Sequence, residues 1–226
     1  MSTFLDSVKT LRSDLSEWLI HFTKGTDEVA SKTLTTILSE SSLRSFTHPY
    51  AICFSEAPLI ELNKLFQLYR KYPEPRYAPF GIAVRKDWFF ERQGRHAIYS
   101  PENEFKFVKD EQKYRLVKHS PPDHDFSWQR EWRVDSKEFK IDAENALVIV
   151  PTEDAAHGLT YDVDVDYEYE GPGETSMHAW IERSWYSLAL DSLPTTSGSS
   201  DSVIANLISA QEIKPKEAEQ GDAPKP

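Results

Sequence analysis

Hydrophobic residues repeat at helical spacing in four segments of the chain. Residues three and four apart share one face of a helix, so this spacing indicates a buried stripe. Pro58 can open one of these helices, because its missing N–H costs nothing in a first turn. The expected helices cover residues 3–16, residues 29–40 with Val29, Leu34, Ile37 and Leu38 inward, the segment after Pro58 with Leu59, Leu62, Leu65, Phe66 and Tyr69 inward, and residues 86–93.

Other segments alternate between apolar and polar residues or form short apolar runs, which is typical of strands. The alternation in residues 18–23 places Trp18, Ile20 and Phe22 on one face and Leu19, His21 and Thr23 on the other. The expected strands cover residues 18–23, 50–54, 80–84, 96–99, 128–134, 146–150 and 161–169. We expect the last of these strands to be half exposed, with one acidic face.

The remaining segments are less clear, but the chain still divides into a folded domain and a tail. Residues 101–125 give no clear pattern, and residues 177–190 fit either a helix or a strand. The mixture of helices and strands indicates an α+β fold. We assign residues 1–193 to a single α+β domain and residues 194–226 to a largely disordered tail, because that tail is rich in Ser, Thr, Pro, Lys and Glu. Within the tail, residues 203–208 could form a short helix or a docking segment.

Charge and cysteine content narrow the class of protein. The net charge is −11 at pH 7, and a surface this acidic disfavours sequence-independent binding to a nucleic-acid duplex. Cys53 is the single cysteine and lies in an apolar run, which indicates an inert buried thiol and fits a cytoplasmic protein. The N-terminus lacks a signal-peptide pattern, and no apolar run reaches the ~20 residues of a membrane helix. We therefore expect no contact with a membrane.

Two strand segments place polar side chains on one face. His21 and Thr23 can present an imidazole and a hydroxyl to the ribose or amide of a ligand, or they can be a core histidine beside a strand threonine. In segment 128–134, Gln129, Glu131 and Arg133 share a face, so a guanidinium can hold the carboxylate ionised and oriented. The alternative is a solvated ion pair, which contributes little.

Other positions are open to two interpretations. Ser55 and Glu56 follow a strand and precede a helix, where they can line a site or cap the helix. Tyr77 and Tyr99 can stack on a planar ligand or cover the edge of the core. Gly81 inside a strand indicates the close approach of another backbone.

Metal and phosphate motifs are weak in this sequence. His119 and His124, beside Asp123 and Asp125, could bind a divalent ion, but the segment is typical of a solvated loop. The sequence has no glycine-rich phosphate loop and no serine nucleophile elbow. We therefore predict no bound metal.

Four segments, in this order, resemble a group of poorly characterised bacterial proteins that includes abortive-infection (phage-resistance) proteins and is similar to the ADP-ribosyltransferase superfamily. The segments are Leu19-Ile20-His21-Phe22-Thr23, Ala51-Ile52-Cys53-Phe54-Ser55-Glu56-Ala57-Pro58-Leu59, Phe80-Gly81-Ile82-Ala83-Val84 and Trp128-Gln129-Arg130-Glu131-Trp132-Arg133. The resemblance implies an ADP-ribosyltransferase-like fold of mixed, mainly antiparallel sheets with flanking helices.

The same resemblance implies roles for individual residues. In that superfamily a histidine on an early strand holds the adenine-side ribose of NAD, an aromatic residue stacks on nicotinamide, and a late glutamate contacts the nicotinamide ribose. This would give His21 the first role, Tyr77 or Tyr99 the second and Glu131 the third. Gln129 would belong to a Gln-x-Glu variant of the glutamate motif, and the NAD site would be completed by Thr23, Ser55 and Arg133. Arg133 or Arg85 could meet the pyrophosphate.

These roles predict an ADP-ribosyltransferase-like toxin or phage-defence effector, with NAD as its substrate. The acceptor would be a protein or a nucleic acid, and an antitoxin could be a further partner. One alternative is a non-catalytic binding or regulatory protein of the same fold, which would dock partners through residues 161–169 and the tail. The other alternative is a metal-dependent nuclease.

Overall fold

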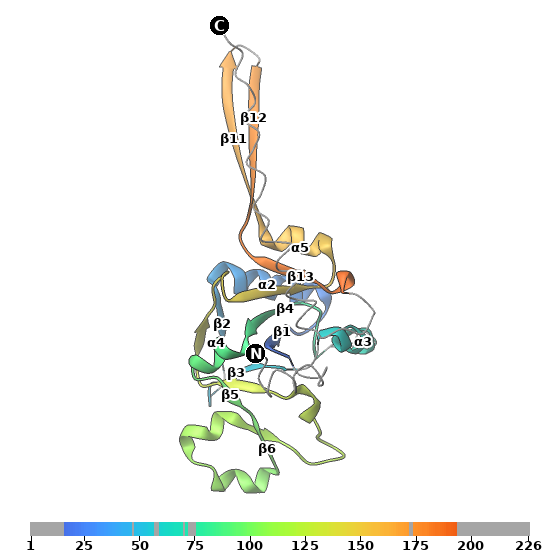
Figure 1. Ribbon diagram of the computed structural model, residues 1–226, viewed down its shortest axis with the longest axis vertical. Helices are drawn as coiled ribbons and strands as arrows, with labels where there is room; N and C mark the ends of the chain where they lie inside the picture. The colour runs from blue at the N-terminus through green and yellow to red at the C-terminus, as the bar shows by residue number, and fades with distance from the viewer. Residues whose placement is uncertain are drawn as a thin grey trace, which may run out of the picture.

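The computed structural model describes residues 16–46, 48–56, 59–69, 71, 76–171 and 174–193. Within them the chain is a mixed α/β structure with mainly antiparallel sheets (Figure 1). The helices are α2 (Asp27–Glu40), α3 (Leu59–Tyr69), α4 (Lys86–Glu91) and α5 (Glu153–Thr160). The helix expected at residues 3–16 and the tail from residue 194 lie outside the described residues, so both stay predictions. Among the described helices, none is long and apolar enough to cross a membrane.

A four-stranded sheet forms the centre of the molecule. Its strand order is β1 (Trp18–Phe22), β4 (Gly81–Arg85), β10 (Ala146–Val150) and β13 (Tyr186–Ala189). The first three strands pair antiparallel, and β13 pairs parallel to β10. The strands expected at residues 18–23, 80–84 and 146–150 are confirmed with shifts of no more than one residue.

The two faces of this sheet bury two separate cores, because successive side chains of a strand point to opposite faces. On β1, Leu19 enters the larger core, while Trp18 and Ile20 enter the smaller one. The larger core is covered by α2, α4 and a second sheet, and the smaller core by α3 with Leu62 and Phe66. The expected division of residues 18–23 between two faces is therefore confirmed.

Helix α2 buries Leu34, Ile37 and Leu38 as expected, but not Val29. Val29 is 53% exposed, and its place is taken by Ala30, which is completely buried with Leu34. The helix begins at Asp27, where the Thr26 side chain accepts a hydrogen bond from the Val29 N–H. Adjacent residues lie about 100° apart around a helix, so an inward Ala30 turns Val29 toward solvent.

The second sheet joins β3 (Ile52–Phe54), β8 (Trp132–Val134) and β5 (Arg95–His96), all antiparallel. It connects to the central sheet through one bridge, in which the backbones of Ile20 and Ser55 exchange two hydrogen bonds of 2.8 Å. This bridge brings the end of β3 beside β1. Residues of both sheets can therefore contribute to one site.

Several expected boundaries differ from the structure. The strand expected at 128–134 begins only at Trp132, because the preceding Ser127–Gln129 form a 3₁₀ helix and Arg130 has a left-handed backbone with φ 46°. The strand expected at 96–99 is divided between β5 and β6 (Ile98–Ser100). The unassigned stretch after it holds 3₁₀ helices η1 (Glu102–Phe107) and η2 (Asp110–Arg115) and strand β7 (Leu116–Lys118), which pairs parallel to β6. Strands β2 (Ser42–Arg44) and β9 (Glu138–Lys140) were not expected, since three residues are too short to show a period.

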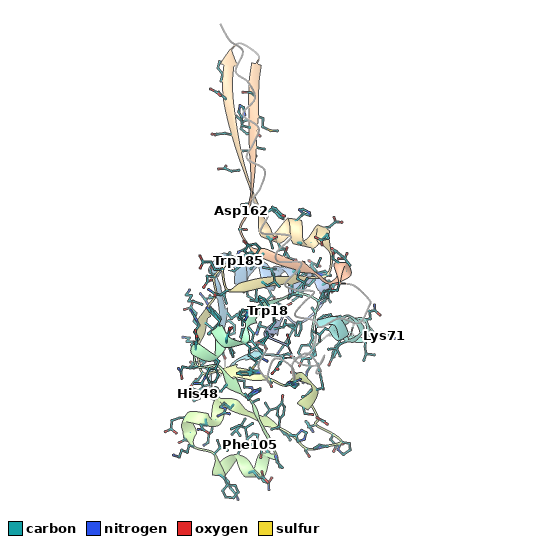
Figure 2. All side chains as sticks on the ribbon, in the orientation of Figure 1. Trp18, His48, Lys71, Phe105, Asp162 and Trp185 are labelled. Carbon is teal, nitrogen blue, oxygen red and sulfur yellow. The ribbon has the colours of Figure 1, made fainter. Side chains whose placement is uncertain are left out.

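A long hairpin of β11 (Tyr161–Gly171) and β12 (Glu174–Arg183) projects from the body next to α5 (Figure 1). At its base the backbone N–H and the hydroxyl of Ser184 both donate to the Thr160 carbonyl. Figure 2 marks the point of departure at Asp162. The strand expected at 161–169 is confirmed, but it is exposed on both faces rather than one, because its described side chains have no layer of structure above them. After the hairpin the chain returns as β13 and the 3₁₀ helix η4 (Leu190–Ser192).

Candidate functional site

The histidine of β1 lies against the last residues of β3. Its Nδ1 donates a 2.8 Å hydrogen bond to the carbonyl of Cys53, and its ring contacts the ring of Phe54. Because a carbonyl can only accept, the hydrogen of a neutral ring must be on Nδ1. Burial lowers the pKa of His21, with the positive charge of Lys24 acting in the same direction, so the ring is neutral at pH 7. Its Nε2 lone pair has no hydrogen-bond partner among the described residues and suits a ligand hydroxyl.

The carboxylate of Glu131 is held by a fork of two hydrogen bonds. Arg133 donates from Nε to Oε1 at 3.1 Å and from Nη2 to Oε2 at 3.2 Å. The remaining nitrogen of Arg133 donates to the carbonyls of Tyr114 and Leu116, which fixes the guanidinium in turn. The Glu131 side chain is only 11% exposed. Each carboxylate oxygen has two lone pairs, so the fork leaves one on each oxygen for a further donor.

Cys53 connects the histidine to the glutamate. Its carbonyl accepts from His21, and its thiol, which donates to the Ala51 carbonyl at 3.9 Å, lies within range of the negative charge of Glu131. Burial and then the negative charge of Glu131 raise the pKa of Cys53 to about 12. A thiol with this pKa stays protonated at neutral pH, so it cannot act as a nucleophile.

The other predicted residues surround this group in a continuous network. The Tyr99 hydroxyl accepts a 2.9 Å hydrogen bond from the Glu131 backbone N–H. The Gln129 side chain donates to the Tyr77 hydroxyl, and the Ser55 hydroxyl donates to the Gln129 carbonyl at 2.8 Å. These bonds fix the backbone on both sides of Arg130.

Two predicted residues have surroundings that favour their structural interpretation. The Thr23 hydroxyl is buried and donates to the Phe80 carbonyl at 2.9 Å, so it serves the sheet rather than a ligand. The Tyr77 ring packs edge-on against three aromatic rings, those of Phe22, Tyr69 and Trp128. Tyr77 therefore covers the edge of the smaller core while its hydroxyl bonds Gln129.

A second carboxylate, that of Glu56, is more buried than Glu131 and has three donors. Lys86 lies 2.9 Å and Arg130 3.1 Å from Oε1, and the Trp132 indole donates to Oε2 at 2.9 Å. The capping interpretation of Glu56 does not account for these long-range bonds. The sequence does hold a sign of these bonds in the alternation of residues 129–133. Arg130 and Trp132 point to Glu56, while Glu131 and Arg133 pair on the other side.

Metal binding finds no support in the part of the chain that is described. There, no group of three or more His, Cys, Asp or Glu side chains is arranged to hold a metal ion.

Comparison with known proteins gives no assignment for this site. No family model, no curated protein and no solved structure gives a significant match to the chain. The geometry of the described residues is therefore the basis for a functional proposal.

Proposed function

We propose that the chain is an ADP-ribosyltransferase-like enzyme that transfers ADP-ribose from NAD to a macromolecule, acting as a toxin or a phage-defence effector. One observation carries the proposal. His21 and Glu131 come from distant parts of the sequence and meet at Cys53, because His21 donates to the Cys53 carbonyl and the charge of Glu131 raises the pKa of the Cys53 thiol. An acceptor nitrogen and a carboxylate that converge on one residue suit a sugar that carries several hydroxyls.

Glu131 has the chemistry needed for cleavage of the nicotinamide bond. When the bond between the ribose C1′ and the nicotinamide nitrogen breaks, its electron pair leaves with nicotinamide and the sugar gains oxocarbenium character. A carboxylate near the 2′-hydroxyl stabilises that positive charge and orients the sugar. The acceptor then forms a bond to C1′ and loses its proton. The Arg133 fork orients the Glu131 carboxylate before the substrate binds.

Arg133 is a positioning residue in this proposal rather than a ligand of the pyrophosphate. Its three nitrogens are occupied by Glu131 and by two backbone carbonyls. The exposed Lys24 is better placed for a phosphate, since its charge acts on both His21 and Cys53. We assign Lys24 to the pyrophosphate and His21 Nε2 to a ribose hydroxyl.

The first experiment follows labelled NAD mixed with the purified protein and a bacterial lysate. We expect label on a macromolecule and release of nicotinamide. Glu131→Gln should lower the transfer rate of the folded protein by at least ~100-fold, because the carboxylate acts mainly in the transition state. Its melting temperature should also fall, because Arg133 loses its charged partner, so the rate is compared at a temperature where circular dichroism shows both proteins folded. Glu144→Gln removes an exposed carboxylate elsewhere and is the matched control. Full turnover by Glu131→Gln would refute the assignment.

Binding is tested separately from transfer. Excess NAD should raise the melting temperature of the wild-type protein, because a ligand that binds only the folded state stabilises it. His21→Ala and Lys24→Ala should each reduce this shift, whereas Glu131→Gln should preserve it. No shift with wild type would favour the second candidate, a non-catalytic binding protein, for which the exposed hairpin is the supporting observation.

A further inference from the structure

The two faces of the β11–β12 hairpin differ in chemistry. Residues directly opposite each other in an antiparallel pair share a face. The register pairs Val165 with Ala179, Tyr167 with Met177, and Tyr169 with Thr175. The other face holds the intervening positions of β11, which are Asp162, Asp164, Asp166 and Glu168, with His178 opposite Asp166 and Ser176 opposite Glu168. One face is therefore mainly apolar and the other mainly acidic.

The apolar face is exposed to solvent. Tyr167 is 68%, Tyr169 71% and Met177 62% exposed, and Val165 is also exposed. Single exposed apolar residues are ordinary, but a contiguous group on a projecting element indicates an interaction site. The described part of the hairpin reaches the body only at its base, beside α5 (Figure 1).

The acidic face carries four carboxylates on alternate positions of a single strand. Asp162, Asp164, Asp166 and Glu168 are all exposed. Residues two apart on a strand are separated by roughly 6.6 Å, so these charges repel one another. A row of positive charges at the same spacing would relieve that repulsion.

Both long edges of the hairpin are open among the described residues, since β11 and β12 pair only with each other there. An isolated two-stranded hairpin is marginally stable, and a third strand adds hydrogen bonds and covered surface. Exposed edges of this length offer unpaired N–H and C=O groups to an incoming strand.

We propose that this hairpin is a docking site for an extended segment of a partner protein in which apolar residues alternate with Lys or Arg. The segment adds to one edge as a third strand. Its period of two then places the apolar side chains beside Tyr167 and Tyr169 and the basic side chains beside the acidic row. The proposal does not depend on NAD chemistry.

Two other occupants fit the surface less well. A second copy of this chain would bring another acidic hairpin to a molecule whose net charge is already −11. The apolar stretch of the tail, Val203-Ile204-Ala205-Asn206-Leu207-Ile208, has no basic residue and does not alternate. Charge complementarity therefore favours a separate basic partner.

The test uses a fluorescent synthetic peptide of roughly ten residues in which Val and Lys alternate, which matches the length of one hairpin strand. Its binding to the full chain is measured by fluorescence anisotropy at low and high salt. A scrambled peptide of the same composition controls for charge alone. We expect wild type to bind the alternating peptide at least ~10-fold more tightly than the scrambled one, with affinity falling as salt screens the charges.

Three variants locate the interaction. Asp164→Lys/Asp166→Lys and Tyr167→Asp should each weaken binding at least ~10-fold, by charge reversal and by loss of the apolar contact. Asp123→Lys/Glu144→Lys makes the same change in net charge on exposed positions of the body and should bind like wild type. Equal binding of both peptides, or unchanged binding by the hairpin variants, would overturn the proposal.

Hydrogen exchange of the free chain distinguishes a separate partner from the two other occupants of the hairpin edge, the tail and a second copy of the chain. We expect the edge amides of the hairpin to exchange quickly in the free monomer and slowly with the peptide bound. Edge amides already protected in the monomer would make the tail the occupant, and protection that appears only on self-association would make it a second copy. Either result overturns the proposal of a separate basic partner.

Discussion

At Cys53 the backbone and the side chain have different roles. The carbonyl fixes the tautomer of His21, and the thiol is buried in the field of Glu131. The two groups on which the proposed chemistry depends are thus connected through a residue that is not reactive itself. The sequence predicted an inert thiol from its apolar run, but it could not show this connection, because the contacts depend on how two sheets meet.

Alkylation of Cys53 measures this environment directly. Iodoacetamide at pH ~8 reacts with thiolate, and the raised pKa leaves very little thiolate in the folded protein. We expect the native rate to be about 1,000-fold lower than the rate in concentrated urea. Since the chain has one cysteine, the signal belongs to Cys53 alone.

The same alkylation rate is measured in the variant Glu131→Gln. It removes the charge that, after burial, contributes most to the raised pKa of Cys53, so alkylation should become faster. A native rate close to the rate in urea, or no change in the variant, would contradict the placement of Glu131 beside the thiol.

At the scale of elements, the segment before β8 has the alternating side chains of a strand without the backbone conformation of one. The sequence predicted a strand over residues 128–134, and the alternating contacts agree with it, although residues before Trp132 are not a strand. Two sets of partners impose this alternation. Glu56 binds the side chains of Arg130 and Trp132, while Tyr77 binds that of Gln129 and Arg133 binds that of Glu131.

Glu56→Gln should therefore destabilise the protein and loosen this segment. The change leaves Lys86 and Arg130 without their shared negative partner in a largely buried place. We expect a loss of roughly 2–3 kcal/mol in the free energy of unfolding, below the full cost of a completely buried pair because both cations keep some contact with water. Urea denaturation measures it. Glu28→Gln, which breaks an exposed pair with Lys32, should cause no measurable change. Equal stability of Glu56→Gln and wild type would show that the network is not structural.

The sequence could predict the elements that are long enough to show a repeating pattern. It could not predict the short elements, which are fixed by tertiary contacts. Strands β1, β4 and β10 and helix α2 have five or more residues with clear patterns, and their predicted bounds differ from the structure by no more than two residues. Strand β13 has only four residues, and the sequence left its segment open between a helix and a strand. The 3₁₀ helices at residues 102–115 and the three-residue strands have no period to detect. Among the site residues, the polar face of residues 129–133 was visible, whereas the donors to Glu56 come from segments far apart in the chain.

For the whole molecule, the contact between β1 and β4 is critical because it lies between both cores. Gly81 pairs with Phe22, and a Cβ at position 81 would lie 2.4 Å from the carbonyl oxygen of His21. The sequence predicted such a close approach from a glycine inside a strand. Backbone atoms cannot swing aside as a side chain can, so the two strands must separate.

Gly81→Ala should lower the free energy of unfolding by roughly 2–3 kcal/mol, in the range of overpacked cores. Gly158→Ala is the matched control, because a Cβ there has no atom within 4 Å and the residue lies inside α5. That variant should stabilise the protein by about 0.5–1 kcal/mol. Denaturation followed by circular dichroism distinguishes the two, and a neutral Gly81→Ala would contradict the β1–β4 register.

The two hydrogen bonds from Ser184 to the Thr160 carbonyl hold the two ends of the hairpin together, so the hairpin is an insertion in the body. The chain leaves and re-enters the body at neighbouring points, so the segment between them can be lengthened, shortened or exchanged without moving β10 or β13. Descendants of this chain can thus acquire new binding partners by changing the insertion, while selection on the rest of the structure continues separately.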